Sequence, residues 1–454
     1  MTLSPRRRLH VTSHNAILTL ISSLLFIAPL SAITGCKSET QKKPAPESTA
    51  DVAVEPKPAP PVEPDDAEAV AALDTAGFLL TKNAAGNVIK VGGLLSEENP
   101  ELLANLAKLP SVTELQLSGP GLTDNGIEVL SKLTNLKRVD LSNSSIGDGA
   151  LQAIKDLKTL EVFFARRTGV SDEGLDNLSG LTRLRAVDLR NTNISNAGMP
   201  ALAKLPRLAD LQLEKSKVSD DGVIAISTLP LKSLNVNYCT AITDEGLKAL
   251  GKTTTLQSLQ MDYSKIKDEG MAAVKNLKDL KRLRIRGTDV TGKGLQNIAE
   301  LKKINRLELR ASSFDDEGMD IIVGLPELTF FDISECKLVS AESLAQIGKL
   351  TKLTVLGLWE TKVNDEAFAN YDKLTEVTEL NLESTSLTDA SLPVILKMDK
   401  LKTINLIGTQ FTDEAFMKIG SMPSLKKMVV TNTGISYDTL DELFELREDL
   451  EVVE

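Results

Sequence analysis

Histidine and cysteine are almost absent from this sequence of 454 residues, and both absences restrict its chemistry. The only histidines are His10 and His14, and the only cysteines are Cys36, Cys239 and Cys336. Nucleophilic triads that use histidine therefore cannot form beyond the first residues, and a zinc site would need two distant thiols and carboxylates. No P-loop or G-x-G-x-x-G follows a strand-like segment. The sequence predicts no catalytic residues, no metal, no cofactor and no enzyme.

The N-terminus has the layout of an export signal. Arg6, Arg7 and Arg8 are followed by the apolar run 16–33 and by small residues before Cys36, which predicts a signal peptide over residues 1–35. Ile33-Thr34-Gly35-Cys36 resembles a bacterial lipobox, and this resemblance implies that Cys36 carries lipid after cleavage. The alternative is an ordinary signal peptide with an incidental cysteine. By resemblance to lipoproteins, Lys37 in place of aspartate favours the outer membrane of the cell envelope.

Charge and hydropathy restrict the partners of the mature chain. Cleavage after Gly35 would remove three of the 52 basic residues and none of the 63 acidic ones, which leaves about 49 against 63. This acidic balance disfavours nonspecific nucleic-acid binding. No later segment has the roughly 20 apolar residues of a membrane span, so the lipid anchor would be the only contact with a membrane.

Two short regions precede the main body of the chain. Residues 36–64 hold the predicted lipidated cysteine and seven prolines with almost nothing apolar, which predicts an extended, disordered tether. Asp65 or Asp66 is expected to cap a helix that runs through Leu73. The segments 78–80 and 88–91 then flank a turn signal and predict a hairpin. We interpret residues 65–91 as the N-terminal cap of a repeat array.

An internal repeat of about 24 residues fills residues 88–454. The pattern L-x-x-L-x-L begins at Val88, Val112, Leu136, Leu160, Leu184, Leu208, Leu231, Leu256, Leu280, Ile304, Leu328, Leu353, Val377, Leu401 and Leu425, and Leu450 suggests a truncated sixteenth unit. Within one unit the apolar residues of the motif should point inward from a short strand, and later apolar residues recur at helical spacing. The predicted fold is an α/β solenoid of about 15 repeats, with a curved parallel sheet on the concave side and short helices on the convex side.

Two further positions in each unit are predicted to be structural. The eighth residue after each start is Ser or Thr, or else Cys239 or Cys336, which indicates a buried ladder of small polar groups rather than reactive or metal-binding thiols. A turn with an aspartate follows, as at Asp172, Asp244 and Asp365. We expect these carboxylates to cap the helices. A row of calcium ligands is the alternative interpretation.

The span from Val88 to Glu454 resembles leucine-rich-repeat proteins. The pieces L-x-x-L-x-L and [IV]-[ST]-D-E-G-L are most similar to the cysteine-containing subclass and to GALA-type repeats. The resemblance implies the solenoid fold and a binding role. Some relatives of this subclass follow an F-box and select substrates for ubiquitin ligases. Here a signal, a tether and a cap stand in that place, so such an adaptor role is a minor alternative.

Outward residues four, six and seven places after each start should line the concave sheet, where a ligand would bind. Arginine, tyrosine and tryptophan are the residues that most often anchor interfaces. The candidate ligand-binding residues are Arg166, Arg190, Tyr238, Tyr263, Arg286, Arg310 and Trp359. Solvated residues without a ligand are the alternative, with cross-strand ion pairs such as Arg286 with Glu308 and Arg310 with Asp332.

These observations favour a non-enzymatic cell-envelope lipoprotein that presents a scaffold for a protein or glycan ligand. A structural spacer without a specific ligand is the alternative. A concave face that is entirely charge-paired would favour the spacer, whereas a clustered and exposed tyrosine, tryptophan and arginine patch would favour binding.

Overall fold

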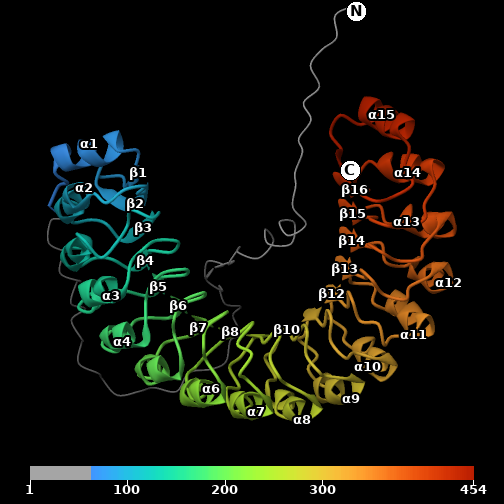
Figure 1. Ribbon diagram of the computed structural model, residues 1–454, viewed down its shortest axis with the longest axis horizontal. Helices are drawn as coiled ribbons and strands as arrows, with labels where there is room; N and C mark the ends of the chain where they lie inside the picture. The colour runs from blue at the N-terminus through green and yellow to red at the C-terminus, as the bar shows by residue number, and fades with distance from the viewer. Residues whose placement is uncertain (1–62) are drawn as a thin grey trace, which may run out of the picture. The chain divides into compact units, whose positions relative to one another are not determined.

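The computed structural model describes residues 63–454, which form one solenoid (Figure 1). The predicted signal segment, Cys36 and the tether up to residue 62 lie outside the described residues. The strands are β1 (Leu79–Lys82), β2 (Val88–Leu94), β3 (Glu114–Ser118), β4 (Arg138–Asp140), β5 (Val162–Phe164), β6 (Ala186–Asp188), β7 (Asp210–Gln212), β8 (Ser233–Asn235), β9 (Ser258–Gln260), β10 (Arg282–Arg284), β11 (Arg306–Glu308), β12 (Phe330–Asp332), β13 (Val355–Gly357), β14 (Glu379–Asn381), β15 (Thr403–Asn405), β16 (Lys427–Val429) and β17 (Glu451–Val453).

The strands form one sheet in the order of the chain. β1 is antiparallel to β2, and from β2 onward each strand is parallel to the next, up to β16 and β17. The register advances by one repeat at each step, so that Leu259, Leu283 and Leu307 lie side by side. The predicted parallel sheet is confirmed, and β17 supplies a strand for the truncated sixteenth unit.

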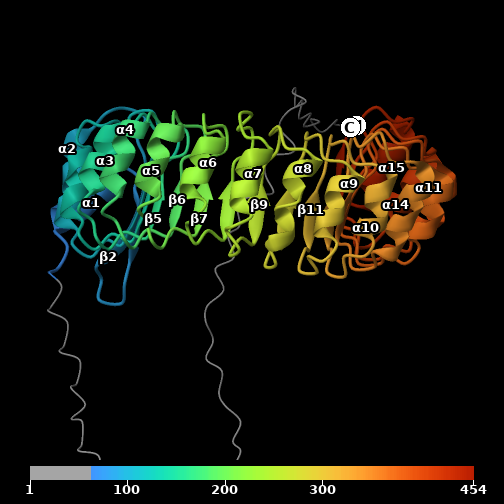
Figure 2. The same ribbon diagram turned by 90° about the horizontal axis from the view of Figure 1, so that it is seen from below.

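Short helices return the chain along the outside of the arc. Figure 2 shows α6, α7, α8 and α9 side by side on the convex side. The α-helices are α1 (Ala67–Thr75), α2 (Pro100–Ala104), α3 (Asp148–Ile154), α4 (Asp172–Leu175), α5 (Met199–Leu202), α6 (Asp220–Ile226), α7 (Asp244–Leu250), α8 (Asp268–Met271), α9 (Gly292–Leu295), α10 (Asp316–Ile322), α11 (Ala341–Ala345), α12 (Asp365–Phe368), α13 (Leu392–Ile395), α14 (Asp413–Gly420) and α15 (Tyr437–Leu446).

Single 3₁₀ turns extend or replace several of these helices. They are η1 (Asn105–Lys108), η2 (Ile127–Lys132), η3 (Asp176–Leu178), η4 (Asn196–Gly198), η5 (Val274–Asn276), η6 (Gln296–Ile298), η7 (Gln346–Lys349), η8 (Ala369–Tyr371) and η9 (Asp389–Ser391). None of the helices within residues 63–454 combines the length and the apolar character that a membrane span requires.

The core runs along the solenoid between the sheet and the helices. In the unit that begins at Leu184, the motif residues Val187 and Leu189 are fully buried, as are Met199 and Leu202 in the helical part. Each coil therefore buries its apolar residues against its two neighbours. This arrangement explains why the apolar positions recur so strictly, since one coil has no closed core of its own.

The two ends of the array differ from the repeats. At the N-terminal end, α1 begins after Asp66, whose carboxylate accepts a hydrogen bond from the Ala69 amide at 2.8 Å. The pair β1–β2 follows. At the C-terminal end, α15 packs Leu440 and Leu443 inward, whereas Tyr437 and Phe444 are exposed.

From the coil that begins at Val112 onward, each complete coil turns out of its strand through a left-handed residue, which lies seven places after the repeat start. Asn143, Arg167 and Asn191 have φ values of 58°, 55° and 56° there, and Gly287 and Gly408 occupy the same position in later coils. The tight turn requires this backbone conformation, which glycine and asparagine adopt readily and which costs other L-residues about 1–2 kcal/mol. The sequence shows this requirement poorly, because lysine, glutamate and even tyrosine also occupy the position.

The ladder of small polar residues follows directly after this turn. Thr192, Ser264 and Thr361, like most other members, donate a hydroxyl hydrogen bond to the carbonyl three residues earlier in the same coil, at 2.6–2.7 Å. The thiol of Cys239 lies 3.3 Å from the carbonyl oxygen of Leu213, and that of Cys336 lies 3.2 Å from the carbonyl oxygen of Leu309, both in the preceding coil. Both thiols are buried, and burial raises the pKa of Cys336 to about 12.

The aspartates at the helix starts act differently from the prediction. Asp172 is the first residue of α4, and Ser171 rather than Asp172 takes the N-cap position. The Asp172 carboxylate accepts the Ser195 amide of the next coil at 2.8 Å, and Asp244 accepts the Lys267 amide at 2.7 Å. The expected capping within one helix is therefore wrong. The carboxylates connect neighbouring coils instead, because each accepts a backbone amide of the next coil rather than one of its own helix.

Candidate ligand-binding face

Five of the seven predicted binding residues lie together at the middle of the concave face. Tyr238 and Tyr263 follow β8 and β9, Arg286 and Arg310 follow β10 and β11, and Trp359 follows β13. Arg166 and Arg190 belong to earlier coils, after β5 and β6. Arg190 makes a two-pronged ion pair with the buried carboxylate of Asp188, with its closest contact at 2.6 Å, and is therefore a structural residue.

Tyr238 and Tyr263, called the tyrosine pair below, stack on each other. Their ring centroids are 4.8 Å apart and their planes are inclined by 15°. The residues are 37% and 38% exposed, so each ring is partly open to solvent, although other large hydrophobic residues such as Tyr437 are more exposed. The Nζ of Lys215 lies 5.3 Å from the Tyr238 ring centroid. The pair thus offers an amphipathic, partly open aromatic surface to the inside of the arc.

The tyrosine pair occupies the left-handed turn position of two consecutive coils. Tyr238 has φ 60° and Tyr263 has φ 55°, values that are unusual for a bulky side chain. Gly287 takes the same position in the next coil, and a Cβ atom there would lie 2.5 Å from the Cδ1 and Cε1 atoms of Tyr263. The Tyr263 ring therefore covers Gly287, and a glycine at this place leaves the room that the ring requires.

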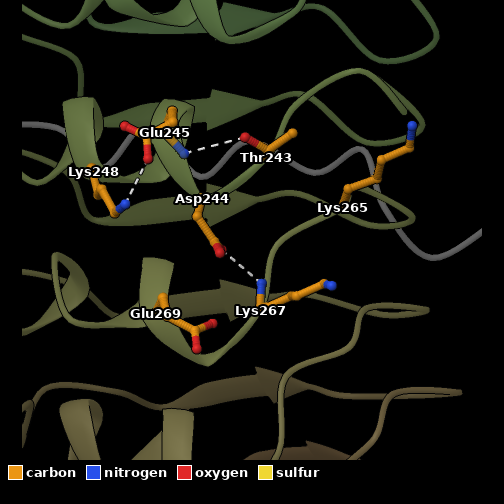
Figure 3. Close-up of a pocket in the computed structure, with 7 residues that line it drawn as sticks. All are labelled: Thr243, Asp244, Glu245, Lys248, Lys265, Lys267 and Glu269. Atoms are coloured by element: carbon orange, nitrogen blue, oxygen red, sulfur yellow. Dashed lines mark hydrogen bonds and ion pairs between the residues drawn. The ribbon is translucent and has the colours of Figure 1, made fainter.

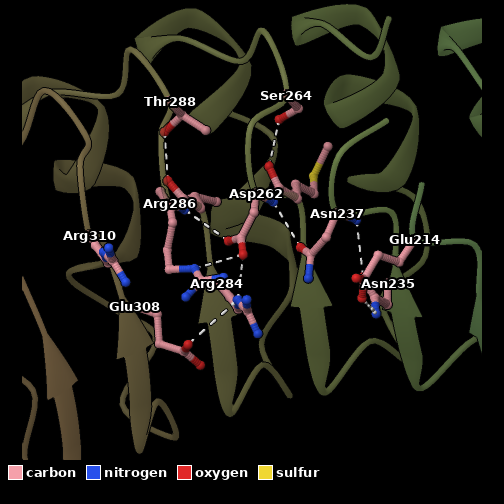
Figure 4. Close-up of polar contacts among 12 residues, drawn as sticks. Glu214, Asn235, Asn237, Asp262, Ser264, Arg284, Arg286, Thr288, Glu308 and Arg310 are labelled. Carbon is pink, nitrogen blue, oxygen red and sulfur yellow. Dashed lines mark hydrogen bonds and ion pairs between the residues drawn. The ribbon is translucent and has the colours of Figure 1, made fainter. Parts of the chain in front are cut away.

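A cluster of arginines lies next to the tyrosine pair. The arginine cluster consists of Arg282, Arg284, Arg286, Arg306 and Arg310, on or just after β10 and β11. Figure 4 shows three of these, Arg284, Arg286 and Arg310, beside Asp262 and Glu308. Asp262 accepts the Nε groups of Arg284 and Arg286 at 2.5 and 2.7 Å, and Glu308 accepts Arg306 Nε at 2.7 Å. Arg282 reaches Glu308 through Nη2 at 3.0 Å.

The carboxylates of this network lie beneath the guanidinium groups. The side chains of Asp262 and Glu308 are 0% and 5% exposed, whereas those of Arg282 and Arg306 are 24% and 28% exposed. Burial raises the pKa of Asp262 to about 6 in spite of the charge of Arg286. Burial also lowers the pKa of Arg282 in spite of Glu308. The guanidinium groups thus cover Asp262 and Glu308, whereas the third carboxylate, Glu335, stays 25% exposed beside Arg310.

The ion pairs differ from the predicted ones. Arg286 bonds to Asp262, the residue at the same position of the preceding coil, rather than to Glu308. Arg310 bonds to Glu335 at 2.9 Å rather than to Asp332. Asp332 instead accepts the amide of Ser334 at 3.0 Å within its own turn, so its carboxylate is already engaged. Spacing along the chain gave the right coil for the partner of Arg310 but the wrong one for Arg286, because it does not show the direction of these long side chains.

Two further aromatic rings hold arginines of the cluster in place. The guanidinium carbon of Arg306 lies 3.6 Å from the Phe330 ring centroid, and that of Arg310 lies 4.2 Å from the centroid of Trp359. Such cation–π contacts are worth about 0.5–2 kcal/mol and fix the planes of the guanidinium groups. The Trp359 ring supports the Arg310 guanidinium group from below, and the sequence did not indicate this contact.

A depression at the helix starts offers no comparable site. Its volume is about 490 Å³, and Thr243, Asp244, Glu245, Lys248 and Lys267 are among its lining residues (Figure 3). Lys248 pairs with Glu245 at 2.6 Å, and Asp244 accepts the Lys267 amide. The Asp244 contact is to a backbone amide, so Glu245 and Lys248 are the charged side chains of this lining that pair with each other. In the described part of the chain no group of three or more histidine, cysteine, aspartate or glutamate side chains is arranged to hold a metal ion.

Comparison with known proteins agrees with this geometry. A family profile described as "Leucine Rich repeat" matches residues 132–155, 230–251 and 252–275. The chain contains leucine-rich repeats. No curated protein matches the sequence.

Solved structures extend the likeness over most of the array. A leucine-rich-repeat protein of Leptospira interrogans is 16% identical with a TM-score of 0.51, and the match covers 87% of this chain and all of that one. An internalin of Listeria monocytogenes is 18% identical with a TM-score of 0.49, over 80% of this chain and 94% of that one. At this identity the likeness shows the fold, which is that of a leucine-rich-repeat solenoid.

Proposed function

We propose that this protein is a non-enzymatic cell-envelope lipoprotein whose leucine-rich-repeat solenoid binds a protein ligand on the concave face. The observation that carries the proposal is the exposed tyrosine pair. The turn residues of the other coils share the backbone conformation of the pair, so the partly exposed, stacked rings rather than the strain support binding.

The chemistry of the surrounding face supports binding rather than catalysis. Tyrosine, tryptophan and arginine are the residues that contribute most to interfaces between proteins. The tyrosine pair, the arginine cluster and Trp359 place these residue types within six consecutive coils, from β8 to β13. The depression at the helix starts is shallow and charged, unlike the apolar cavities that usually hold small substrates.

Anchoring at Cys36 belongs to the proposal on sequence grounds alone. The basic start, the apolar run and the lipobox-like Ile33-Thr34-Gly35-Cys36 support export and lipid attachment, and Lys37 favours the outer membrane. We also propose that the repeats are related to the cysteine-containing, GALA-type subclass, because Cys239 and Cys336 occupy the ladder position.

Capture of a partner from envelope extracts tests the binding role. The full-length chain would be extracted from membranes in mild detergent and compared with Tyr238→Asn/Tyr263→Asn. Asparagine suits the left-handed turn, as Asn143 and Asn191 show, so the variant removes the rings without straining the backbone. The matched control is Arg167→Asn, which makes the same kind of change at the turn position three coils before Tyr238.

We expect one protein to copurify with the wild type and with Arg167→Asn and to be lost from the tyrosine variant. Equal recovery by all three chains would contradict a binding role for the tyrosine pair. Recovery of no protein at all would favour the spacer, and recovery of a glycan would favour the glycan alternative.

Lipid attachment is tested separately. Cells that express the wild type or Cys36→Ser would be labelled with a radioactive fatty acid and fractionated. The wild type should carry label and sediment with the outer membrane, and the variant should carry none. Label on the variant would exclude Cys36 as the attachment site.

A further inference from the structure

The arginine cluster exposes donors that its own carboxylates do not use. Each of the five guanidinium groups donates one side-chain hydrogen bond to Asp262, Glu308 or Glu335. A guanidinium group has five N–H donors, so most donors of the cluster are directed elsewhere. The Nε of Arg282 is buried and has no hydrogen-bond partner among the described residues.

The cluster also carries more positive than negative charge. Five guanidinium groups contact three carboxylates, and burial raises the pKa of the neighbouring Asp332, which disfavours a fourth negative charge. The whole chain has a net charge of −11, so this positive patch is a local departure from its composition. Exposed guanidinium edges are well suited to bind carboxylates in a two-pronged geometry.

We infer that the arginine cluster and the tyrosine pair together bind an extended acidic segment of the partner protein, with carboxylates on Arg282 and Arg306 and an apolar side chain on Tyr263. This inference rests on the proposed function and names the chemistry of its partner. The tyrosine pair is continuous with the cluster, because the amide of Tyr263 donates to the Arg286 carbonyl at 2.7 Å and the Tyr263 ring covers Gly287.

The dimensions of the face favour a peptide over a small anion. Parallel strands are about 4.8 Å apart, so the five steps from β8 to β13 span roughly 24 Å. An extended segment of about seven residues covers this length at roughly 3.3 Å per residue. A single phosphate would engage only one or two arginines and would make no use of the tyrosine pair.

The test uses the full-length chain and synthetic peptides of about twelve residues, long enough to cover the face. The first peptide has glutamate at every second position, one central phenylalanine and serine elsewhere. The second has glutamine in place of glutamate, and inorganic phosphate is the third probe. Calorimetry measures affinity. The fluorescence of Trp359, the only tryptophan of the chain, reports whether binding occurs beside Arg310.

We expect the acidic peptide to bind saturably and to change the Trp359 fluorescence, and the glutamine peptide not to bind. Arg282→Gln/Arg306→Gln should weaken binding about tenfold or more, as for the loss of charge pairs at an interface. Arg138→Gln/Arg167→Gln, which removes two concave arginines of other coils, should leave the affinity within about twofold. Circular dichroism checks the fold. If the first variant does not fold, Arg306→Lys replaces it and should weaken binding less but measurably, because lysine keeps the charge without the planar fork.

Equal binding of both peptides, equal loss in both arginine variants, or no saturable binding would overturn the inference. Phosphate that binds as tightly as the acidic peptide would also overturn it and would indicate a simple anion site. A separate result would contradict the proposed function. That result is capture of the same partner from envelope extracts by Tyr238→Asn/Tyr263→Asn and by the wild type.

Discussion

Replacement of the tyrosine pair should barely change, or even raise, the stability of the solenoid. Each Tyr→Asn change relieves about 1 kcal/mol of left-handed backbone strain, because asparagine accepts positive φ more readily. Stacking of the two rings contributes about 0.5–1.5 kcal/mol, and either single variant loses all of it. Each single variant should therefore be close to the wild type in its free energy of unfolding. The double variant loses the same single stacking contact, but backbone strain is relieved at two positions.

A double-mutant cycle measures this relation. Urea unfolding of the wild type, Tyr238→Asn, Tyr263→Asn and the double variant should give a coupling energy of about 1 kcal/mol. Arg167→Asn, with φ 55° in the same row, should show the strain relief without any loss of the stacking. A coupling near zero, or a double variant less stable by more than about 3 kcal/mol, would refute the reasoning. A loss of that size is typical of a core aromatic residue and would mean that the pair serves the fold.

Three further substitutions test the remaining structural claims. Leu307→Ala should lower the free energy of unfolding by roughly 2–5 kcal/mol, measured by urea denaturation, because it leaves a cavity between coils. Asp220→Ala should cost about 1–3 kcal/mol, since Asp220 accepts the amide and hydroxyl of Thr243, whereas Asp220→Asn should cost less because Asn196 fills this place naturally. Burial raises the pKa of Asp262 in the folded protein from its ordinary value of 3.8 to about 6, so its contribution to stability is fully present below about pH 4 and declines as the pH rises to 6. The stability of the wild type relative to Asp262→Asn should therefore fall by up to about 3 kcal/mol between pH 4 and pH 7, and an unchanged or opposite difference in urea denaturation would contradict the raised pKa.

The repeat period was enough to predict most of the fold. The candidate site also depends on local backbone geometry, which the repeat period does not reveal. Leu184, Val187 and Leu189 could be assigned to the core from spacing alone, because one inward face per coil permits no other arrangement. The left-handed turn could not be assigned in the same way, since Lys215 and Tyr238 give no signal of positive φ. A run of glycine and asparagine at this position in other coils was the clue that could have revealed it.

The contacts of long side chains were the other part that spacing could not supply. The prediction paired Arg286 with Glu308 because both are concave residues of adjacent coils. The actual partner is Asp262, which is fully buried and already accepts the backbone amide of Arg286 at 3.0 Å. Carboxylates held in this way attract the nearest guanidinium group. Such a preference depends on burial and hydrogen bonding, which the sequence pattern does not contain.

The arrangement of charge and aromatic rings favours a binding scaffold over a spacer. A spacer needs no aromatic residues at its turns, and its arginines would all be neutralised, as Arg190 is by Asp188. From β8 to β11 the coils differ from this in two ways, since two stacked tyrosines occupy neighbouring turns and five guanidinium groups contact only three carboxylates. The two features lie next to each other. A common ligand that interacts with both is the simplest physical reason for their coincidence.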